Sequence, residues 1–194
     1  VVVLDPSDTS YSQLWQYAVT EEQPNGVFLA ERGFSAVGSA TPQSAMGDFT
    51  TKVYDGYVAG YVYDETGFTS AANRRDLRGD VTLSADFQNA AISGLISNVT
   101  TSERERGQPA GPREPLDGNF VLEEGAIDQN GFSGALTADA TLQTNADIAT
   151  MEGSYSGGFY GPNAEEAAGA FSARIEATDG SASNIVGGFR APSQ

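Results

Sequence analysis

The chain has 194 residues, which is enough for one domain with a sizeable hydrophobic core. Its 26 acidic and 10 basic residues give a formal net charge of −16, and such a surface repels phosphate backbones, so no nucleic-acid partner is expected. Histidine and cysteine are both absent, which excludes disulfides, Ser–His and Cys–His catalytic pairs, and zinc held by either residue. No run of about 20 apolar residues is present, so no membrane-spanning helix is expected.

The first residues differ from the rest, and residues 1–26 are expected to form an N-terminal extension or docking arm, followed by one β-rich domain at residues 27–194. Residues 1–4 are a candidate edge strand, whereas the spacing of Leu14, Trp15 and Val19 favours a helical turn. Trp15, the only tryptophan, is expected to anchor the arm on the domain, with a ligand contact as the alternative. Because the chain starts without methionine, a removed export signal is expected.

From residue 27 onward the sequence predicts many short strands joined by tight turns, since 23 glycines accompany frequent Thr, Tyr, Phe and Val. Asp55-Gly56 is a strong hairpin signal inside the β-rich run 49–63. The alternation of Val81, Leu83, Ala85 and Phe87 predicts a strand, and Gln88-Asn89 predicts the turn into the next strand. About eight to ten strands are expected in all.

Six arginines are candidates for partner binding. Three lie in the polar stretch 66–78 and three in the proline- and glycine-containing stretch 102–115, namely Arg74, Arg75, Arg78, Arg104, Arg106 and Arg113. Both stretches are expected to be exposed loops, and arginine on loops favours recognition of a partner. The alternative is that these arginines balance nearby carboxylates on solvated loops.

A tyrosine-rich run is the candidate for a small-ligand site. Its members are Tyr54, Tyr57, Tyr61 and Tyr63, of which the last three alternate on one face of a strand. In a chain without histidine, a haem iron would need tyrosine or methionine, so these tyrosines or Met46 are the candidate ligands. Packing in a core or on a surface is the alternative role of such an aromatic stripe.

Metal and catalytic sites are not expected. The segment Asp128-Gln129-Asn130-Gly131 resembles part of a calcium loop, but the other spaced ligands and the terminal glutamate are missing, so a turn is expected. The carboxylate pairs Glu123-Glu124 and Glu165-Glu166 have no visible partner for acid–base chemistry. Glu165 and Glu166 follow Gly161-Pro162, which ends a strand, and are expected to be charges at the start of a short helical corner.

Two glycine-rich segments carry a resemblance to a known family. The first is Phe159-Tyr160-Gly161-Pro162 followed by Ala164-Glu165-Glu166 and Gly169-Ala170-Phe171, and the second is Ala85-Asp86-Phe87, a turn, and Ile92-Ser93-Gly94-Leu95-Ile96. Both are similar to hairpins of the β-barrel domain of transferrin-binding protein B and its surface-lipoprotein relatives. The resemblance implies an all-β fold, a single eight-stranded antiparallel β-barrel with a short helical corner. It also implies an exported bacterial protein at the outer-membrane surface or in the periplasm, with a lipidated cysteine upstream of Val1.

Three functional hypotheses follow. The first is a non-enzymatic binding protein that captures a protein or small ligand through barrel-end loops carrying the six arginines. The second is a haem or small-molecule carrier that uses the tyrosine-rich face, although no cofactor is otherwise implied. The third is a structural subunit of a surface assembly, in which residues 1–26 dock on a neighbour; the oligomeric state stays open.

Overall fold

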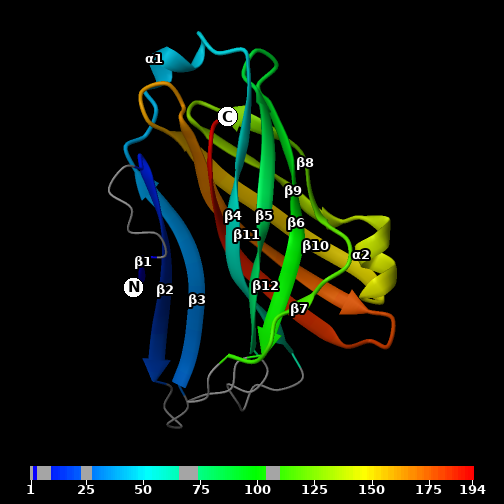
Figure 1. Cartoon of the computed structure of the whole chain (residues 1–194). Coiled ribbons are helices and arrows are strands. Elements are labelled where there is room, and N and C mark those ends of the chain that lie inside the picture. Colours follow the sequence, from blue (N-terminus) through cyan, green and yellow to red (C-terminus); the bar gives the residue numbers. More distant parts are fainter. Residues whose placement is uncertain (1, 4–9, 23–27, 66–73, 104–109) are drawn as a thin grey trace.

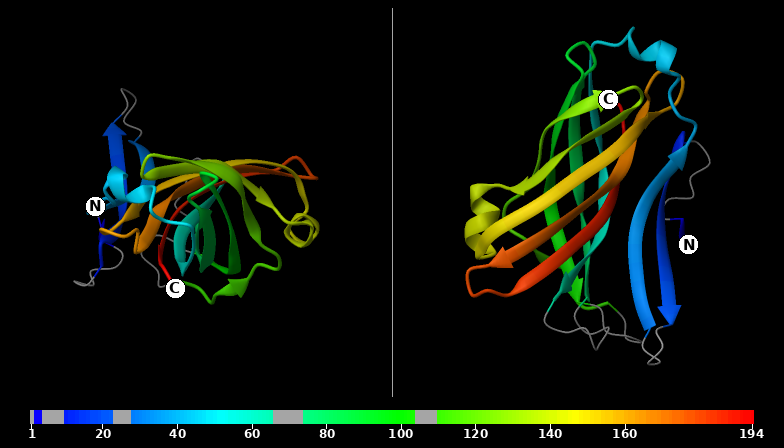
Figure 2. Two further views of the ribbon diagram at one scale, coloured as in Figure 1. Left: turned by 90° about the horizontal axis from the view of Figure 1, so that it is seen from above. Right: turned by 180° about the vertical axis from the view of Figure 1, so that it is seen from behind.

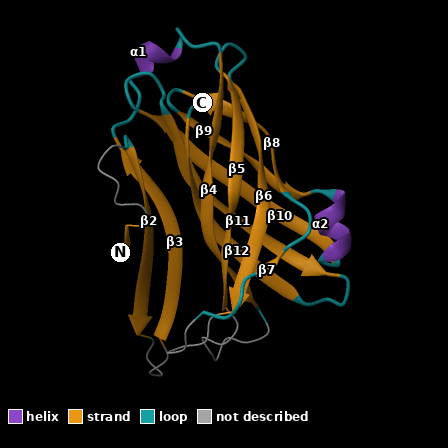
Figure 3. Cartoon of the chain, in the orientation of Figure 1, coloured by secondary structure: helices purple, strands orange, loops and turns teal. Residues whose placement is uncertain are grey.

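The computed structural model describes residues 2–3, 10–22, 28–65, 74–103 and 110–194. Nearly all regular structure is β (Figures 1 and 3). The strands are β1 (Val2–Val3), β2 (Ser12–Glu22), β3 (Phe28–Gly38), β4 (Thr51–Asp64), β5 (Arg74–Asp86), β6 (Ala91–Glu103), β7 (Glu114–Pro115), β8 (Phe120–Asp128), β9 (Gly131–Ala138), β10 (Ile148–Tyr160), β11 (Glu166–Ala177) and β12 (Ala182–Pro192). The two helices are α1 (Gln43–Met46) and α2 (Ala140–Asn145).

Eight antiparallel strands close into a barrel, as the resemblance implied. Their order is β5-β4-β12-β11-β10-β9-β8-β6, and pairing of β5 with β6 closes the ring. The short strand β7 pairs with Thr100 and Thr101 of β6, beyond the stretch of β6 that pairs with β8. Closure pairs every barrel strand on both sides, so no long strand edge of the barrel is left to aggregate.

The barrel wall follows from alternation of side chains. In β5, Val81 and Leu83 are buried in the interior, whereas Thr82 and Ser84 are exposed outside. The turn expected at Gln88-Asn89 joins β5 to β6, and Asp86 accepts hydrogen bonds from both backbone N–H groups of that turn. The sequence pattern of this hairpin therefore predicts both its inward face and its turn.

Aromatic rings fill the barrel interior toward α1. The Phe159 ring is fully buried, and its centroid lies 4.9 Å from that of Phe87, 5.1 Å from that of Phe132 and 5.8 Å from that of Tyr54. Rings at such separations gain contact energy beyond their buried area. The glycine-rich segment around Phe159 thus supplies the centre of the core.

The expected hairpin at Asp55-Gly56 is wrong, because β4 runs unbroken through both residues. Gly56 serves a different purpose: a Cβ atom there would overlap the Arg190 carbonyl and Ala191 of the neighbouring strand β12. Glycine is needed at this position for close approach of two strands rather than for a turn.

Residues expected to form helical turns are not helical. The Leu14, Trp15 and Val19 segment is strand β2, because it pairs along its length with β3 and this tertiary pairing overrides a weak helical spacing. The corner after Gly161-Pro162 is a hydrogen-bonded turn, in which the Ala164 N–H donates to the Gly161 carbonyl at 3.3 Å. Positive φ angles of 86° at Gly161 and 52° at Ala164 prevent an α-helix there.

Strand β3 lies outside the barrel. It pairs with β2, and β2 with β1, in a separate three-stranded sheet. This outer sheet stands beside the barrel against β11 and β12 (Figure 2). The β-rich stretch at the start of the expected domain 27–194 is therefore part of the same sheet as the expected arm.

We expect Phe159→Ala to lower the free energy of unfolding by about 3–5 kcal/mol, because it opens a cavity among three other rings. Urea denaturation measures this loss. Val53→Ala, at a position on β4 that faces solvent, is the control and should change stability by less than about 0.5 kcal/mol. Equal effects of the two substitutions would contradict the described core.

Candidate binding surface beside the outer sheet

The outer sheet is seated on the barrel by apolar contacts that glycine makes possible. Leu14 of β2 is fully buried, and a Cβ atom placed on Gly188 of β12 would lie 2.5 Å from the Leu14 Cδ1 atom and 3.0 Å from the Phe34 Cβ atom. Because Gly188 lacks a side chain, Leu14 and Phe34 can lie directly on the barrel wall. Trp15 is only half-buried and alternates with Leu14, so Leu14, and not Trp15, is the anchor of this sheet.

A buried ion pair joins the barrel to the outer sheet. Arg190 of β12 contacts Glu166 of β11 through two hydrogen bonds, Nη2 to Oε1 at 3.0 Å and Nε to Oε2 at 3.2 Å. The Ser12 hydroxyl and N–H donate to Glu166 Oε2 at 2.6 and 2.9 Å, and the Tyr11 N–H donates to Oε1 at 3.1 Å. Burial raises the pKa of Glu166, but these donors outweigh it and leave the pKa below its usual value.

The position of Glu166 after a proline predicted a charge at the start of a helix, and this prediction is wrong. Glu165 is closer to that expectation, since its carboxylate accepts hydrogen bonds from the Asn163 N–H at 2.8 Å and the Asn163 side chain at 2.9 Å. Of the two adjacent glutamates, Glu166 is the one that accepts hydrogen bonds from Tyr11 and Ser12 at the start of the outer sheet.

The structure places three of the six candidate arginines along the outer face of the barrel. Arg74 and Arg78 belong to β5, not to a loop. Arg113 precedes β7 and donates from Nη1 to the carbonyl and hydroxyl of Thr100, both at 3.1 Å, and Thr100 is the residue that pairs with Arg78. Burial and then the charge of Arg78 lower the pKa of Arg113, which reflects how close the two guanidinium groups lie.

The other three candidate arginines do not join this group. Arg75 is turned to the other side of β5, where its Nη2 atom lies 3.0 Å from Asp64 Oδ1. Arg104 and Arg106 lie outside the described residues. Placement of Arg75 follows from the strand period, because neighbours on one strand face opposite sides.

The tyrosines of the tyrosine-rich run also lie on both sides of their strand. Tyr57, Tyr61 and Tyr63 share one face of β4, as predicted, and the structure shows that this face is the outer one, since the alternate residues Val58 and Val62 are buried in the barrel. Tyr54 is instead fully buried in the barrel, where its hydroxyl donates to the Ala164 carbonyl at 3.0 Å. Burial raises the pKa of Tyr54 above its usual value. Met46, the alternative iron ligand, is the last residue of α1 and packs in the barrel core, so it joins no site with the outward tyrosines.

Tyr61 links the arginines to the outer sheet. The guanidinium carbon of Arg74 lies 4.6 Å above the centroid of the Tyr61 ring, a cation–π arrangement, and Arg74 Nη2 lies 3.3 Å from Asp76 Oδ1. On its other side Tyr61 is 5.7 Å from Phe34 of β3, centroid to centroid. Burial raises the pKa of Tyr63, whereas the nearby charges of Arg32 of β3 and of Arg74 act to lower it.

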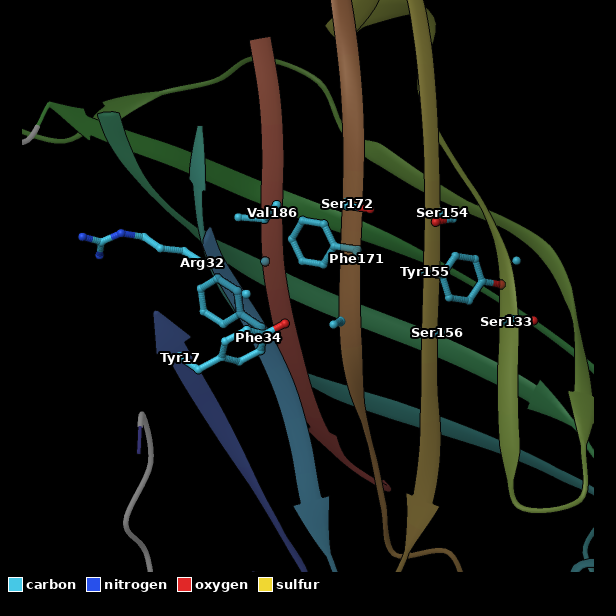
Figure 4. A pocket seen from close by; sticks show the side chains of 14 residues that line it. Tyr17, Arg32, Phe34, Ser133, Ser154, Tyr155, Ser156, Phe171, Ser172 and Val186 are labelled. Atoms are coloured by element: carbon cyan, nitrogen blue, oxygen red, sulfur yellow. The ribbon is translucent and has the colours of Figure 1, made fainter. Parts of the chain in front are cut away.

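We call this cluster the arginine–tyrosine surface; it comprises Arg32, Phe34, Tyr61, Tyr63, Arg74, Arg78 and Arg113. The sequence offered no signal that would add Arg32 and Phe34, because their proximity depends on how the outer sheet docks. A hydroxyl-lined groove of about 550 Å³ continues from it between β3 and the barrel wall (Figure 4). Its floor includes Ser133, Ser154, Ser156 and Ser172, outward residues of β9, β10 and β11.

The chemistry of this surface suits binding. Guanidinium groups and serine hydroxyls donate hydrogen bonds, and the aromatic rings supply flat apolar contacts. Among the described residues, no group of three or more acidic side chains could hold a metal ion, and Asp128 and Asn130 belong to the β8–β9 turn region. The described helices are all too short to cross a membrane.

Comparison with known proteins identifies the barrel. Residues 46–192 match the family model described as the C-lobe and N-lobe β-barrels of Tf-binding protein B. The matched range contains every barrel strand and leaves out the outer sheet. None of the curated proteins compared with the chain matches it.

Solved structures share this fold. A single mutant and a double mutant of the vaccine antigen transferrin-binding protein B from Haemophilus parasuis Hp5 superpose with TM-scores of 0.53 and 0.55 at 20% and 23% identity. Each alignment covers 96% of this chain and 33% of the other. Isotype 1 of the protein from serogroup B Neisseria meningitidis gives a TM-score of 0.47 at 22% identity, over 97% of this chain and 33% of that one. The chain thus spans about a third of the length of these proteins.

We expect Glu166→Gln to lower the free energy of unfolding at pH 7 by about 3 kcal/mol, because it leaves the buried Arg190 charge without its counter-ion. The folded-state pKa of Glu166 lies below the usual 4.5, so the carboxylate stabilises the protein above that pH and loses its effect as the pH falls through the folded pKa. The difference between the two proteins should therefore shrink in urea titrations taken from pH 7 to pH 3.

Glu165→Gln is the matched control for this prediction. It removes a neighbouring carboxylate whose hydrogen bonds are confined to Asn163, so we expect a loss of about 1 kcal/mol or less. A Glu166→Gln loss that is no larger, or that grows on acidification, would show that the ion pair does not stabilise the fold.

Proposed function

Because the chain belongs to the family of C-lobe and N-lobe β-barrels of transferrin-binding protein B, we propose that it is a non-enzymatic binding protein that captures an acidic partner protein on the arginine–tyrosine surface. The proposal places the protein outside the cytoplasm, at the outer-membrane surface or in the periplasm, with a lipid anchor upstream of Val1. The solved structures from Haemophilus parasuis that share the fold are named for binding transferrin, so transferrin is the first partner to test.

The observation that carries the proposal is a local reversal of charge. The whole chain has a net charge of −16, yet four arginines lie on the outer face: Arg32 and Arg74 act on Tyr63 beside the outer sheet, and Arg78 and Arg113 lie together further round the barrel at Thr100. Arg74 is neutralised by Asp76, whereas Arg78 and Arg113 form no ion pair with any described residue. Positive groups on an acidic protein orient an acidic partner toward one face and repel it elsewhere.

The aromatic residues of the surface provide apolar contact area, which a protein interface also needs. Tyr61 is half-buried against the buried ring of Phe34, and Arg74 lies over its face. Arginine and tyrosine are the residue types that most often dominate binding energy in interfaces, and aromatic anchors beside charged rims are the usual arrangement. The serine-lined groove next to them can accept hydrogen-bonding groups from an extended part of the partner.

We expect the double substitution Arg78→Glu and Arg113→Glu to weaken capture of the partner at least about tenfold, since it reverses two exposed charges at the surface. Both side chains are exposed, so the melting temperature should stay within a few degrees. The measurement is surface plasmon resonance with transferrin, together with a pull-down from host serum and identification of the captured protein by mass spectrometry.

Arg174→Glu is the matched control, because Arg174 is an exposed arginine of β11 engaged with Glu65 and Glu176 and lies outside the surface. It should leave capture unchanged. Unchanged capture by the double variant, or an equal loss in the control, would rule out the arginine–tyrosine surface as the binding site.

A second candidate, the haem or small-molecule carrier, has one specific observation in its favour. The Tyr63 hydroxyl is shielded from solvent and has no hydrogen-bond partner among the described residues, and Arg32 and Arg74 lie close enough to act on its pKa. The tyrosine can supply a phenolate ligand for the haem iron, and the neighbouring arginines can supply cations for the haem carboxylates. Access to the hydroxyl would require the surrounding side chains to move.

Titration with haem tests this second candidate. Binding through Tyr63 should shift the Soret band in the unmodified protein and not in Tyr63→Phe, while Tyr57→Phe, a control on the same face of β4, should bind as the unmodified protein does. Absence of a Soret shift in the unmodified protein would end this alternative.

A further inference from the structure

The two ends of the barrel interior are filled differently. Toward α1, the rings around Phe159 pack against one another. Toward α2, a cavity of about 490 Å³ opens between the ends of the strands, and Phe120 is the one aromatic residue in its lining. An eight-stranded barrel is just wide enough either to be filled by side chains or to hold one small ligand. In this barrel side chains fill the end near α1, and the end near α2 has room for a ligand.

The wall of the cavity is aliphatic. Val62, Leu77 and Ile185 line it from the barrel interior. Ile148 and Ile175 line it too and are only partly buried, so they present apolar surface to the open space. Covering such surface with an apolar ligand is favourable by about 25 cal/mol per Å², and the cavity volume lies in the range of about 300–1,000 Å³ typical of small-molecule sites.

Three polar residues form a rim on the same inward side. Asp64, Arg75 and Ser183 each lie two positions from a buried core residue on their strand, and all three line the cavity. Asp64 Oδ1 accepts hydrogen bonds from Arg75 Nη2 at 3.0 Å and from the Ser183 hydroxyl at 2.8 Å. We call the aliphatic cavity and this rim together the barrel mouth.

The rim has spare donors on Arg75. Its guanidinium makes one hydrogen bond to a described side chain, Asp64, and has five N–H groups in all. The free edge of a guanidinium matches the two oxygens of a carboxylate. The preferred head group is therefore an anion with two oxygens in a plane.

We infer that the barrel mouth binds a medium-chain carboxylic acid, with its alkyl chain in the aliphatic cavity and its carboxylate on Arg75. This site is separate from the arginine–tyrosine surface: Arg75 faces the opposite side of β5 from Arg74 and Arg78. A ligand here would fill the half of the barrel that the protein's own side chains leave open. The two sites can therefore be tested independently. The protein could bind the acid without capturing a partner protein, or capture a partner without binding the acid.

Titration of the full chain with decanoate, followed by calorimetry and by amide chemical shifts, tests the inference. Saturable binding should shift signals of the mouth residues Ile148, Ile175 and Ile185 and leave those of Ser154 and Ser172 in the outer groove unchanged. Arg75→Gln should weaken decanoate binding about tenfold or more, yet leave binding of 1-decanol, which lacks the carboxylate, unchanged. The Asp64–Arg75 pair is partly exposed, so this variant should fold.

A cavity-filling pair of variants tests the position of the chain. Ala146 lines the mouth, so Ala146→Phe should abolish decanoate binding by occupying the space, whereas Ala149→Phe, at an exposed position of β10, should not. If Ala146→Phe does not fold, the chemical shifts of the unmodified protein still locate the ligand. The inference is overturned if decanoate does not saturate below millimolar concentration, if its shifts fall in the outer groove, or if Arg75→Gln binds it as tightly as before.

Discussion

The arrangement of the outer sheet depends on one buried ion pair, Glu166 with Arg190. Their side chains are only 7% and 10% exposed, and a charge in such a place is costly unless it is paired and fully hydrogen-bonded. The remaining acceptor capacity of Glu166 is taken by Tyr11 and Ser12. The start of β2 is therefore held to the barrel by the requirement that this carboxylate be satisfied.

The consequences of that contact extend across the outer face. With β2 held in place, β3 is held by its pairing to β2, and Phe34 comes to lie against Tyr61. The barrel supplies Arg74 through the register of β5 with β4. A binding surface built from two sheets thus rests on a contact near one end of their boundary, and neither sheet contains the complete surface by itself.

The barrel has two surfaces of different chemistry because its wall has two sides. Along β5, Arg74 and Arg78 face out toward solvent and the outer sheet, while Arg75 faces in toward an aliphatic cavity. The first environment suits a large charged partner, since the guanidinium groups of Arg78 and Arg113 there are exposed. The second suits a small molecule with one charged end, because one arginine stands at the rim of an apolar space.

The sequence by itself determined the barrel: the period of two in strands such as β5, the turn at Gln88-Asn89, the hairpins of the family and the shared face of Tyr57, Tyr61 and Tyr63. It did not determine the site. A period of two tells which residues share a face of a strand but not which distant residue lies opposite that face. Glu166 is 24 residues from Arg190 and 154 residues from Ser12 along the chain, yet it is hydrogen-bonded to both. Gly56 was predicted to lie in a turn, but it lies where two strands approach closely. Only the tertiary structure decided these contacts, because they arise from the packing of strands that are far apart in the chain.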